Sequence, residues 1–175
     1  MQSPGSRSEM NGAGAQGETS NLFRILLSVP VPWVFVLTYL VGVVLQLFFP
    51  VIVRGPAELQ LSMVAGIALF AVGAVFASWS LIIFHKTRTT TTPGETSKTL
   101  VTWGPYRLSR NPMYVSLILA YVGEAGMLSQ IWPLVVLPFT LAYINGVVIP
   151  LEEFRLKEVF EDKYEHYRAA VRRWI

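Results

Sequence analysis

Long uncharged tracts alternate with short polar segments along this chain. Residues 31–53 and 61–84 form apolar tracts of 23 and 24 residues that contain no acidic or basic side chain. Because about 20 apolar residues suffice for a helix to cross a bilayer, both tracts predict membrane-spanning helices. The second tract is rich in small residues that favour close packing against another helix, namely Ala65, Gly66, Ala71, Gly73, Ala74 and Ala77.

The second half of the chain contains two further apolar tracts, at residues 113–128 and 131–150. Glu124 interrupts the first of them, and two prolines lie inside the second. Only Ser129 and Gln130 separate the two tracts, so we expect a tight helical hairpin. The pattern therefore predicts an all-α integral membrane protein with four transmembrane helices, the last two of which form the hairpin.

The tail, residues 151–174, is charged and has a helical pattern. Its larger apolar residues recur every three or four positions and predict one stripe along a single amphipathic helix; they are Leu156, Phe160, Tyr164, Tyr167, Val171 and Trp174. The Glu152-Glu153 pair favours a helix start and Arg172-Arg173 a helix end. We expect this helix to lie along the membrane surface or to pack back on the bundle.

The remaining segments are polar. The first 22 residues are rich in Gly, Ser, Gln and Asn and predict a disordered leader, which leaves residues 23–175 as a single membrane domain. Residues 85–112 form a long connection that carries five Lys or Arg residues and one acid. A loop of this length without secondary structure is usually functional or disordered.

Composition and charge narrow the class of protein. Charged residues make up 14% of the chain, against about 25% in soluble domains. The net charge is +3, but the basic residues flank apolar tracts, where they bind membrane lipids, so we do not predict nucleic-acid binding. The absence of cysteine excludes disulfides, thiolate catalysis and Cys-ligated metals, and two distant histidines do not predict a metal site.

The positions of Lys and Arg predict the topology. With four spans, both termini and the 85–112 loop share one side of the membrane. The opposite side receives only residues 54–58 and Ser129-Gln130, which together contain one Arg and one Glu. By the positive-inside rule the shared side is cytoplasmic.

Residues that can carry chemistry gather on this predicted cytosolic face. Residues 104–114 directly precede the third span, and Glu152 and Glu153 directly follow the fourth, so the hairpin brings the two segments together. An arginine fork fits a carboxylate, acidic side chains hold an ammonium or ribose hydroxyls, and aromatic rings stack a base. The segments predict a site for a zwitterionic, aromatic ligand, and its first segment supplies Tyr106, Arg107, Arg110 and Tyr114.

The segment from Leu100 to Tyr114, LVTWGPYRLSRNPMY, resembles the T-x-G-x-Y-x-x-x-R-H-P-x-Y stretch of isoprenylcysteine carboxyl methyltransferases and of the related phospholipid methyltransferases. In that family a third span containing glycine, a short hairpin, an acidic pair and an F-x-x-x-Y-x-x-Y tail follow. Here the same order is given by Gly123, Ser129-Gln130, Glu152-Glu153 and Phe160/Tyr164/Tyr167. The resemblance covers about the last 80 residues.

This resemblance implies an S-adenosylmethionine site on the cytosolic face and a lipophilic methyl acceptor that enters from the bilayer. It implies cofactor-binding roles for Tyr106, Arg110, Asn111, Pro112, Tyr114, Glu152 and Glu153, and the chemistry of the segment adds Arg107 as a further candidate. Among these, Arg110, Glu152 and Glu153 are the candidate catalytic residues. The reaction would be an in-line displacement at the sulfonium methyl group, which needs alignment and a dry pocket more than a strong acid or base.

Two departures from the family pattern concern the site. Asn111 stands where the family usually has His, but an amide still donates and accepts hydrogen bonds. The arginine that often precedes the acidic pair in the eukaryotic enzymes is absent, since residues 147–149 are Val-Val-Ile. Its absence weakens the case for a prenylcysteine carboxylate as the acceptor.

Each candidate residue also has a structural interpretation. Arg107 and Arg110 could be positive-inside anchors, and the acidic pair could be first-turn acids that satisfy the helix dipole. Glu124 lies inside a predicted span, where a carboxylate is costly; it could line an acceptor tunnel or be protonated near the outer interface.

The sequence leaves the acceptor and the class of function open. A carboxylate acceptor is already a nucleophile, whereas an amine needs a base, for which Glu152 or Glu153 is the candidate. One rival class is the membrane sterol reductases, which carry a similar R-x-P-x-Y element and bind NADPH. The other is a non-enzymatic membrane-packing or accessory protein.

Overall fold

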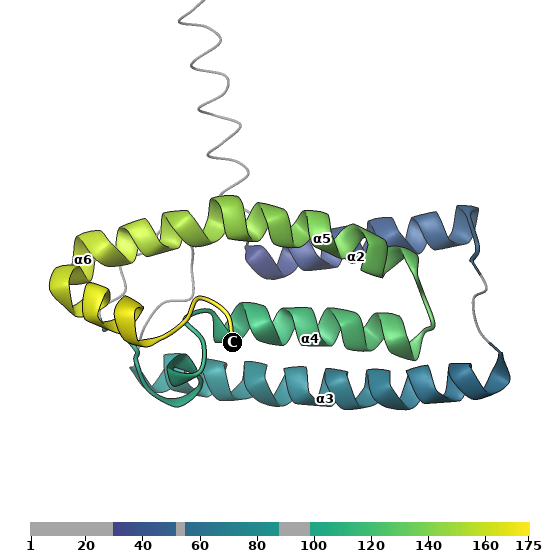
Figure 1. The fold of residues 1–175 in the computed structure, drawn as a ribbon, viewed down its shortest axis with the longest axis horizontal. Coiled ribbons are helices and arrows are strands. Elements are labelled where there is room, and N and C mark those ends of the chain that lie inside the picture. The colour runs from purple at the N-terminus through teal and green to yellow at the C-terminus, as the bar shows by residue number, and fades with distance from the viewer. Residues whose placement is uncertain (1–29, 52–54, 88–98) are drawn as a thin grey trace, which may run out of the picture.

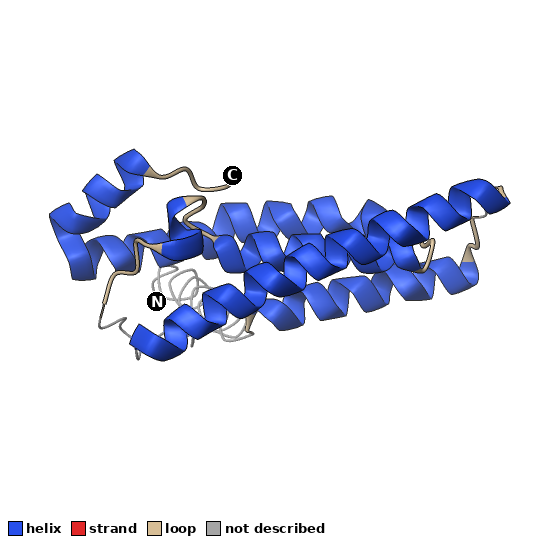
Figure 2. Ribbon diagram, turned by 90° about the horizontal axis from the view of Figure 1, so that it is seen from below, coloured by secondary structure: helices blue, strands red, loops and turns tan. Residues whose placement is uncertain are grey.

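The computed structural model of the protein describes residues 30–51, 55–87 and 99–175. The predicted leader, residues 1–22, lies outside these ranges. All regular secondary structure in the described part of the chain is helical (Figure 2). The elements are α2 (Val31–Phe48), α3 (Pro56–Thr87), the 3₁₀ turn η1 (Gly104–Arg107), α4 (Pro112–Met127), α5 (Trp132–Tyr143), the π-helical segment η2 (Ile144–Val148) and α6 (Ile149–Ala170).

Three helices are long and apolar enough to cross a membrane. They are Val31–Phe48, Ala57–Ile83 and the continuous stretch Trp132–Ala170, of which the part up to Leu151 is free of charge. The prediction of an all-α membrane protein is thereby confirmed in its coarse form. The remaining apolar helix, α4, has 16 residues and so a length of about 24 Å, somewhat short of the ~30 Å hydrocarbon core.

The helices pair into two layers (Figure 1). α2 packs mainly along α5, and α3 packs along α4. The turn between α4 and α5 is short and contains Ser129 at a φ of 52°, and the chain reverses direction there (Figure 1). Each helix of the predicted hairpin therefore has its main packing partner in the first half of the chain.

Glycines allow α3 and α4 to approach each other closely. A Cβ atom at Gly123 would lie 2.5 Å from the backbone nitrogen of Phe70 and 2.8 Å from the carbonyl oxygen of Gly66. One at Gly73 would lie 2.9 Å from the carbonyl oxygen of Ser116. Of the small residues predicted to support packing, Gly66 and Gly73 therefore do so through direct backbone approach.

Aromatic side chains fill the space between α2, α4 and α5. The Tyr121 ring lies edge-on to the rings of Tyr39 and Phe35, with centroid distances of 4.9 Å and 6.1 Å. The Tyr121 hydroxyl donates to the carbonyl oxygen of Pro133 at 3.0 Å. Such hydrogen bonds satisfy polar tips that would otherwise be costly inside a bilayer. The two layers are thus joined by an aromatic core.

The predicted spans and the 85–112 loop differ from the structure at their ends. α2 ends at Phe48 rather than at residue 53, and α3 continues to Thr87, beyond the predicted start of the loop. The loop also contains η1, in which Pro105 fixes its own φ angle at a value that suits a tight helical turn. Residues 88–98 of the predicted loop lie outside the described residues.

The tail predicted as one amphipathic helix over residues 151–174 is helical up to Ala170, but the helix is kinked. Glu161 has a φ of 44° and a ψ of −120°, which kinks α6, and the helix ends at Ala170. After the kink the chain turns back toward the bundle (Figure 1). The expected apolar stripe is divided as a result: Tyr164 and Tyr167 join a second core with Ile83, whereas Trp174 packs against the first core.

Candidate functional site

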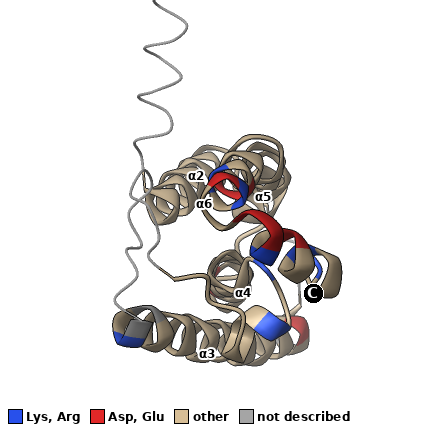
Figure 3. Ribbon diagram, turned by 90° about the vertical axis from the view of Figure 1, so that its left-hand side faces the viewer, with Lys and Arg blue, Asp and Glu red and all other residues tan. Residues whose placement is uncertain are grey.

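Charged residues gather at the end of the molecule formed by α6 (Figure 3). α2 and α5 contain no charged residue, and along the continuous helix from Trp132 the charges begin at Glu152. Charged side chains cost several kcal/mol in the centre of a bilayer, so this end is the one that faces water or headgroups. The segment 104–114 and the acidic pair both lie here.

The η1 turn is seated on the end of α3. Gly104 has a φ of 65°, and a Cβ atom there would lie 2.5 Å from the Cδ1 atom of Ile83. The carbonyl oxygen of Tyr106 accepts a hydrogen bond from the Tyr167 hydroxyl at 2.8 Å. Burial, aided by the nearby Tyr167 and Glu152, raises the pKa of the Tyr106 phenol. This ring therefore stays neutral and packs between the loop and the folded-back tail.

The start of α4 positions a tyrosine on the first glutamate of the acidic pair. Pro112 is buried at the first helical position, where a missing N–H costs nothing. Two residues further on, the Tyr114 hydroxyl donates to Oε1 of Glu152 at 2.6 Å. Burial raises the pKa of the Glu152 carboxyl, while the hydrogen bond from Tyr114 lowers it. Glu152 is thus a carboxylate with enhanced affinity for a proton.

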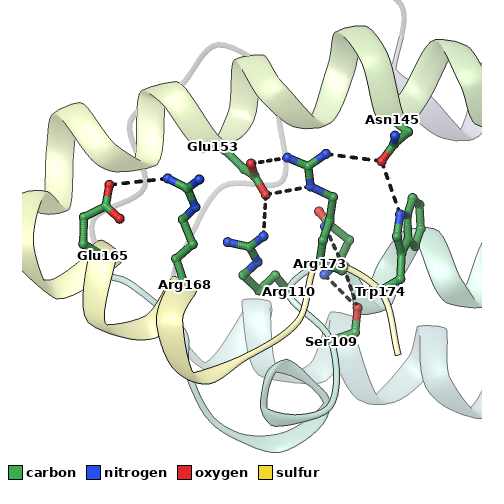
Figure 4. A network of polar contacts seen from close by, with 9 residues as sticks. Ser109, Arg110, Asn145, Glu153, Glu165, Arg168, Arg173 and Trp174 are labelled. Carbon is green, nitrogen blue, oxygen red and sulfur yellow. Dashed lines mark hydrogen bonds and ion pairs between the residues drawn. The ribbon is translucent and has the colours of Figure 1, made fainter.

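Two arginines share the carboxylate of Glu153 (Figure 4). Nη2 of Arg110 lies 3.1 Å from Oε1. Arg173 contacts both oxygens, with Nε 3.1 Å from Oε1 and Nη2 2.7 Å from Oε2. We call these three residues the arginine–glutamate cluster. Because it contains two cations and one anion, it has a formal charge of +1.

Arg110 has donors that the cluster does not use. Its side chain is only 10% exposed, yet Nε and Nη1 are buried and have no hydrogen-bond partner among the described residues. These two nitrogens carry three N–H bonds. A buried charged donor without a partner is costly and uncommon, so these nitrogens are the exception among the polar groups at this end.

The last residues hold the loop from the other side. We call residues 171–175 the strap. The backbone N–H of Arg110 donates to the carbonyl oxygen of Arg172 at 2.9 Å. The carbonyl oxygen of Arg173 accepts from Oγ of Ser109 at 3.1 Å and from Nδ2 of Asn111 at 3.0 Å. The strap therefore fixes both the main chain and the side chains that flank Arg110.

The π-helical segment η2 contributes a polar residue to the same end. Oδ1 of Asn145 accepts from Nη1 of Arg173 and from Nε1 of Trp174, each at 3.3 Å (Figure 4). A π-bulge widens a helix locally and often occurs at functional sites. Here the bulge lies where the apolar part of the helix approaches the arginine–glutamate cluster.

Most of the residues predicted from sequence lie together at this end. Direct hydrogen bonds or ion pairs join Tyr114 to Glu152 and Arg110 to Glu153, and the strap contacts Asn111. Arg107 differs, because its side chain is exposed and forms no ion pair with a described residue. Glu124 is exposed in the last turn of α4, far along that helix from Tyr114.

Three further residues at this end, Arg173, Asn145 and Ser109, are not among those that the sequence predicts for the site. Arg173 was interpreted as a helix-end charge, but the helix ends at Ala170 and the residue contacts Glu153 instead. Asn145 carried a usable signal, since it is a polar residue inside an apolar tract. Ser109 carried none, because serine is ordinary in a polar loop.

Comparisons with known proteins give matches to methyltransferases. A family profile described as phospholipid methyltransferase matches residues 61–163. Two rice proteins, from Oryza sativa subsp. indica and subsp. japonica, are each named "Probable protein-S-isoprenylcysteine O-methyltransferase" and are 39% identical over 74 residues. The match covers 41% of this chain and 38% of each rice protein. No solved structure gives a significant match.

Proposed function

Because this chain belongs to the phospholipid methyltransferase family, we propose that it transfers a methyl group from S-adenosylmethionine to a lipophilic acceptor at the membrane surface. The observation that carries the proposal is the convergence of the 104–114 segment and the acidic pair around a buried arginine with unpaired donors. When bound, the cofactor supplies an electrophilic methyl group on a sulfonium.

The residues at this end fit the charges of that cofactor. The N–H groups on Nε and Nη1 of Arg110 suit the carboxylate of its amino-acid part, since charge-assisted hydrogen bonds are the strong ones. The Glu152 carboxylate suits an ammonium or ribose hydroxyls. Tyr106 and Pro112 shape the loop that places Arg110, and Asn111 fixes that loop to the strap.

The two members of the acidic pair take different roles in this proposal. Glu153 has both oxygens engaged by arginines, so it holds the arginine–glutamate cluster together and does not serve as a base. Glu152 is the candidate base, because burial gives it an enhanced proton affinity. It would accept the proton that an amine acceptor loses on methylation.

The acceptor class that fits best is a lipid-like amine. The buried Glu152 carboxylate would attract the ammonium form of an amine and accept its proton, whereas it would repel a carboxylate acceptor. The name of the rice proteins points instead to an isoprenylcysteine carboxylate. Both acceptor classes therefore belong in the test.

In the membrane, we propose four spans. They are the three long apolar helices and α4, which comes third in chain order. α4 is short, but it packs along α3 through glycine and backbone contacts, so it shares the bilayer environment of that helix. The end that carries α6 and the arginine–glutamate cluster then faces the cytoplasm by the positive-inside rule. Both termini would lie on that side.

The test is methyl transfer in membranes that contain the protein. Radiolabelled S-adenosylmethionine is supplied together with either an amine-headgroup phospholipid or a farnesylcysteine analogue, and label in the lipid extract is counted. We expect label in the phospholipid and its loss in Glu152→Gln. Label only in the farnesylcysteine analogue would overturn the amine assignment, and label in neither would overturn the proposed function.

A further inference from the structure

Arg173 and Arg110 compete for one carboxylate. Arg173 binds Glu153 through two nitrogens at 3.1 Å and 2.7 Å, whereas Arg110 reaches it through Nη2 alone at 3.1 Å. A carboxylate offers two oxygens and about four lone-pair sites. Arg173 takes two of these sites, one on each oxygen, and Arg110 takes one, while Nε and Nη1 of Arg110 remain without a partner among the described residues.

Removal of Arg173 would change this balance. Glu153 would then have one oxygen without a partner, and an arginine fork pairs with a carboxylate most favourably through two parallel hydrogen bonds. The Arg110 side chain would turn to give Glu153 a second donor. That rotation would turn the N–H groups on Nε and Nη1 of Arg110 away from their present direction.

Contacts other than the Arg110 side chain also hold Arg173 in place. Its carbonyl oxygen is held by Ser109 and Asn111, and its Nη1 by Asn145. Contacts from the loop and from the continuous α5–α6 helix thus place this guanidinium before anything binds. Its side chain is 32% exposed, more than that of Arg110, which fits a supporting role at the edge of the site.

We propose that Arg173 is a positioning residue: by engaging both oxygens of Glu153, it keeps the remaining N–H groups of Arg110 available for the carboxylate of the bound ligand. This inference rests on the proposed function, because it assumes an S-adenosylmethionine-like ligand. It assigns no ligand contact to Arg173 itself.

Two ligands that differ by one carboxylate test the proposal. S-adenosylhomocysteine carries the carboxylate, and its decarboxylated analogue lacks only that group. Affinities of both are measured by calorimetry with the full chain in detergent, for the wild type, Arg173→Met and Arg172→Met. Arg172, the preceding residue, is the matched control. Its side chain is exposed, and the loop contacts only its carbonyl oxygen.

We expect Arg173→Met to weaken S-adenosylhomocysteine binding at least tenfold and to change the affinity for the decarboxylated analogue less than threefold. Arg172→Met should leave both affinities unchanged. An equal loss for both ligands in Arg173→Met would show a general structural role and overturn the proposal. So would an unchanged affinity for S-adenosylhomocysteine.

A second variant covers the case in which Arg173→Met does not fold. Arg173→Lys keeps the charge but offers a single point donor, so it frees part of Glu153 and should show the same selective loss, smaller in size. A loss in Arg173→Lys that is the same for both ligands again overturns the proposal. If the wild type binds neither ligand, the proposed function itself has failed, and the two failures are thus distinguishable.

Discussion

The α3–α4 interface and the arginine–glutamate cluster are held together by opposite kinds of contact. Along α3 and α4, the contact depends on missing side chains, since glycines let the two backbones touch. At the α6 end, contact depends on long charged side chains that converge from the loop, the helix and the strap. The first region leaves no room for a ligand, and the second leaves donors for one.

This difference separates stability from function. The glycine interface is fully satisfied by its own contacts, as expected for helices that associate by close packing in lipid. The arginine–glutamate cluster keeps Arg110 buried with Nε and Nη1 unpaired, which lowers stability unless something binds. Changes in the first region should therefore act on folding, and substitution of Arg110 itself should act on ligand affinity.

The largest expected effect is in the glycine interface. Gly123→Leu would drive a side chain into the backbone of α3, where even a Cβ atom lies 2.5 Å from the Phe70 nitrogen. Backbone atoms cannot move aside as a core side chain can. We therefore expect the free energy of unfolding to fall by more than the ~1–3 kcal/mol of ordinary overpacking, and folded protein to be lost. Gly146→Ala is the control, because a Cβ atom there meets nothing within 4 Å. The monodisperse fraction after detergent extraction measures both; equal yields would contradict the close approach.

The next effect concerns Glu153 as the centre of its cluster. Glu153→Leu leaves two arginines without their counter-charge, one of them buried, and breaking such a buried pair costs about 3–5 kcal/mol. Glu158→Leu removes an exposed acid from the same helix and serves as the control. Thermal unfolding in detergent should show a clear drop for Glu153→Leu alone. A melting temperature equal to that of the control would mean that the ion pairs add no stability.

Substitution of Arg110 should spare the fold and impair the site. Arg110→Met removes a charge-assisted contact worth about 1.5–3 kcal/mol, so kcat/KM for S-adenosylmethionine should fall roughly 10- to 150-fold. Arg107→Met tests the neighbouring predicted cofactor residue, whose side chain is exposed, and should leave kcat/KM unchanged. The opposite ranking of the two arginines would move the site to the outer face of the loop.

The smallest effect is a shift in pH dependence. As a base, Glu152 must be ionised, so activity should rise with pH through its pKa, which burial holds above the usual range. The Tyr114 hydrogen bond lowers that pKa, so Tyr114→Phe should move the rising limb of kcat/KM to higher pH. Initial rates across the acidic and neutral range measure the limb. Movement to lower pH would exclude Glu152 as the group that titrates.

Much of the architecture followed from periodicity and length. Uncharged tracts located α2, α3 and α5, because a helix in lipid requires a run of apolar residues whatever its partners. The kink at Glu161 was not predictable, since a positive φ at a glutamate is disfavoured locally and persists only through tertiary contacts. For the same reason the periodic stripe predicted a tail helix but not the place at which it turns back.

The candidate site was only partly visible in the sequence. Arg110 and the acidic pair were found because a motif frames them, and the structure brings them into contact. Arg173 was not predicted because its role depends on the folded-back strap. The strap brings Arg173 to its partner Glu153, which lies 20 residues earlier in the chain. Periodicity places residues within an element, whereas contacts between distant segments depend on how the chain turns.

The central claim is that the end carrying Arg110 and Glu152 holds S-adenosylmethionine. Parallel calorimetric titrations of the purified wild-type protein with S-adenosylhomocysteine and with NADPH test it most directly. The account predicts saturable, one-site binding of S-adenosylhomocysteine and no saturable binding of NADPH. Saturable binding of NADPH alone would contradict it and favour a reductase, and binding of neither would favour a non-enzymatic membrane protein.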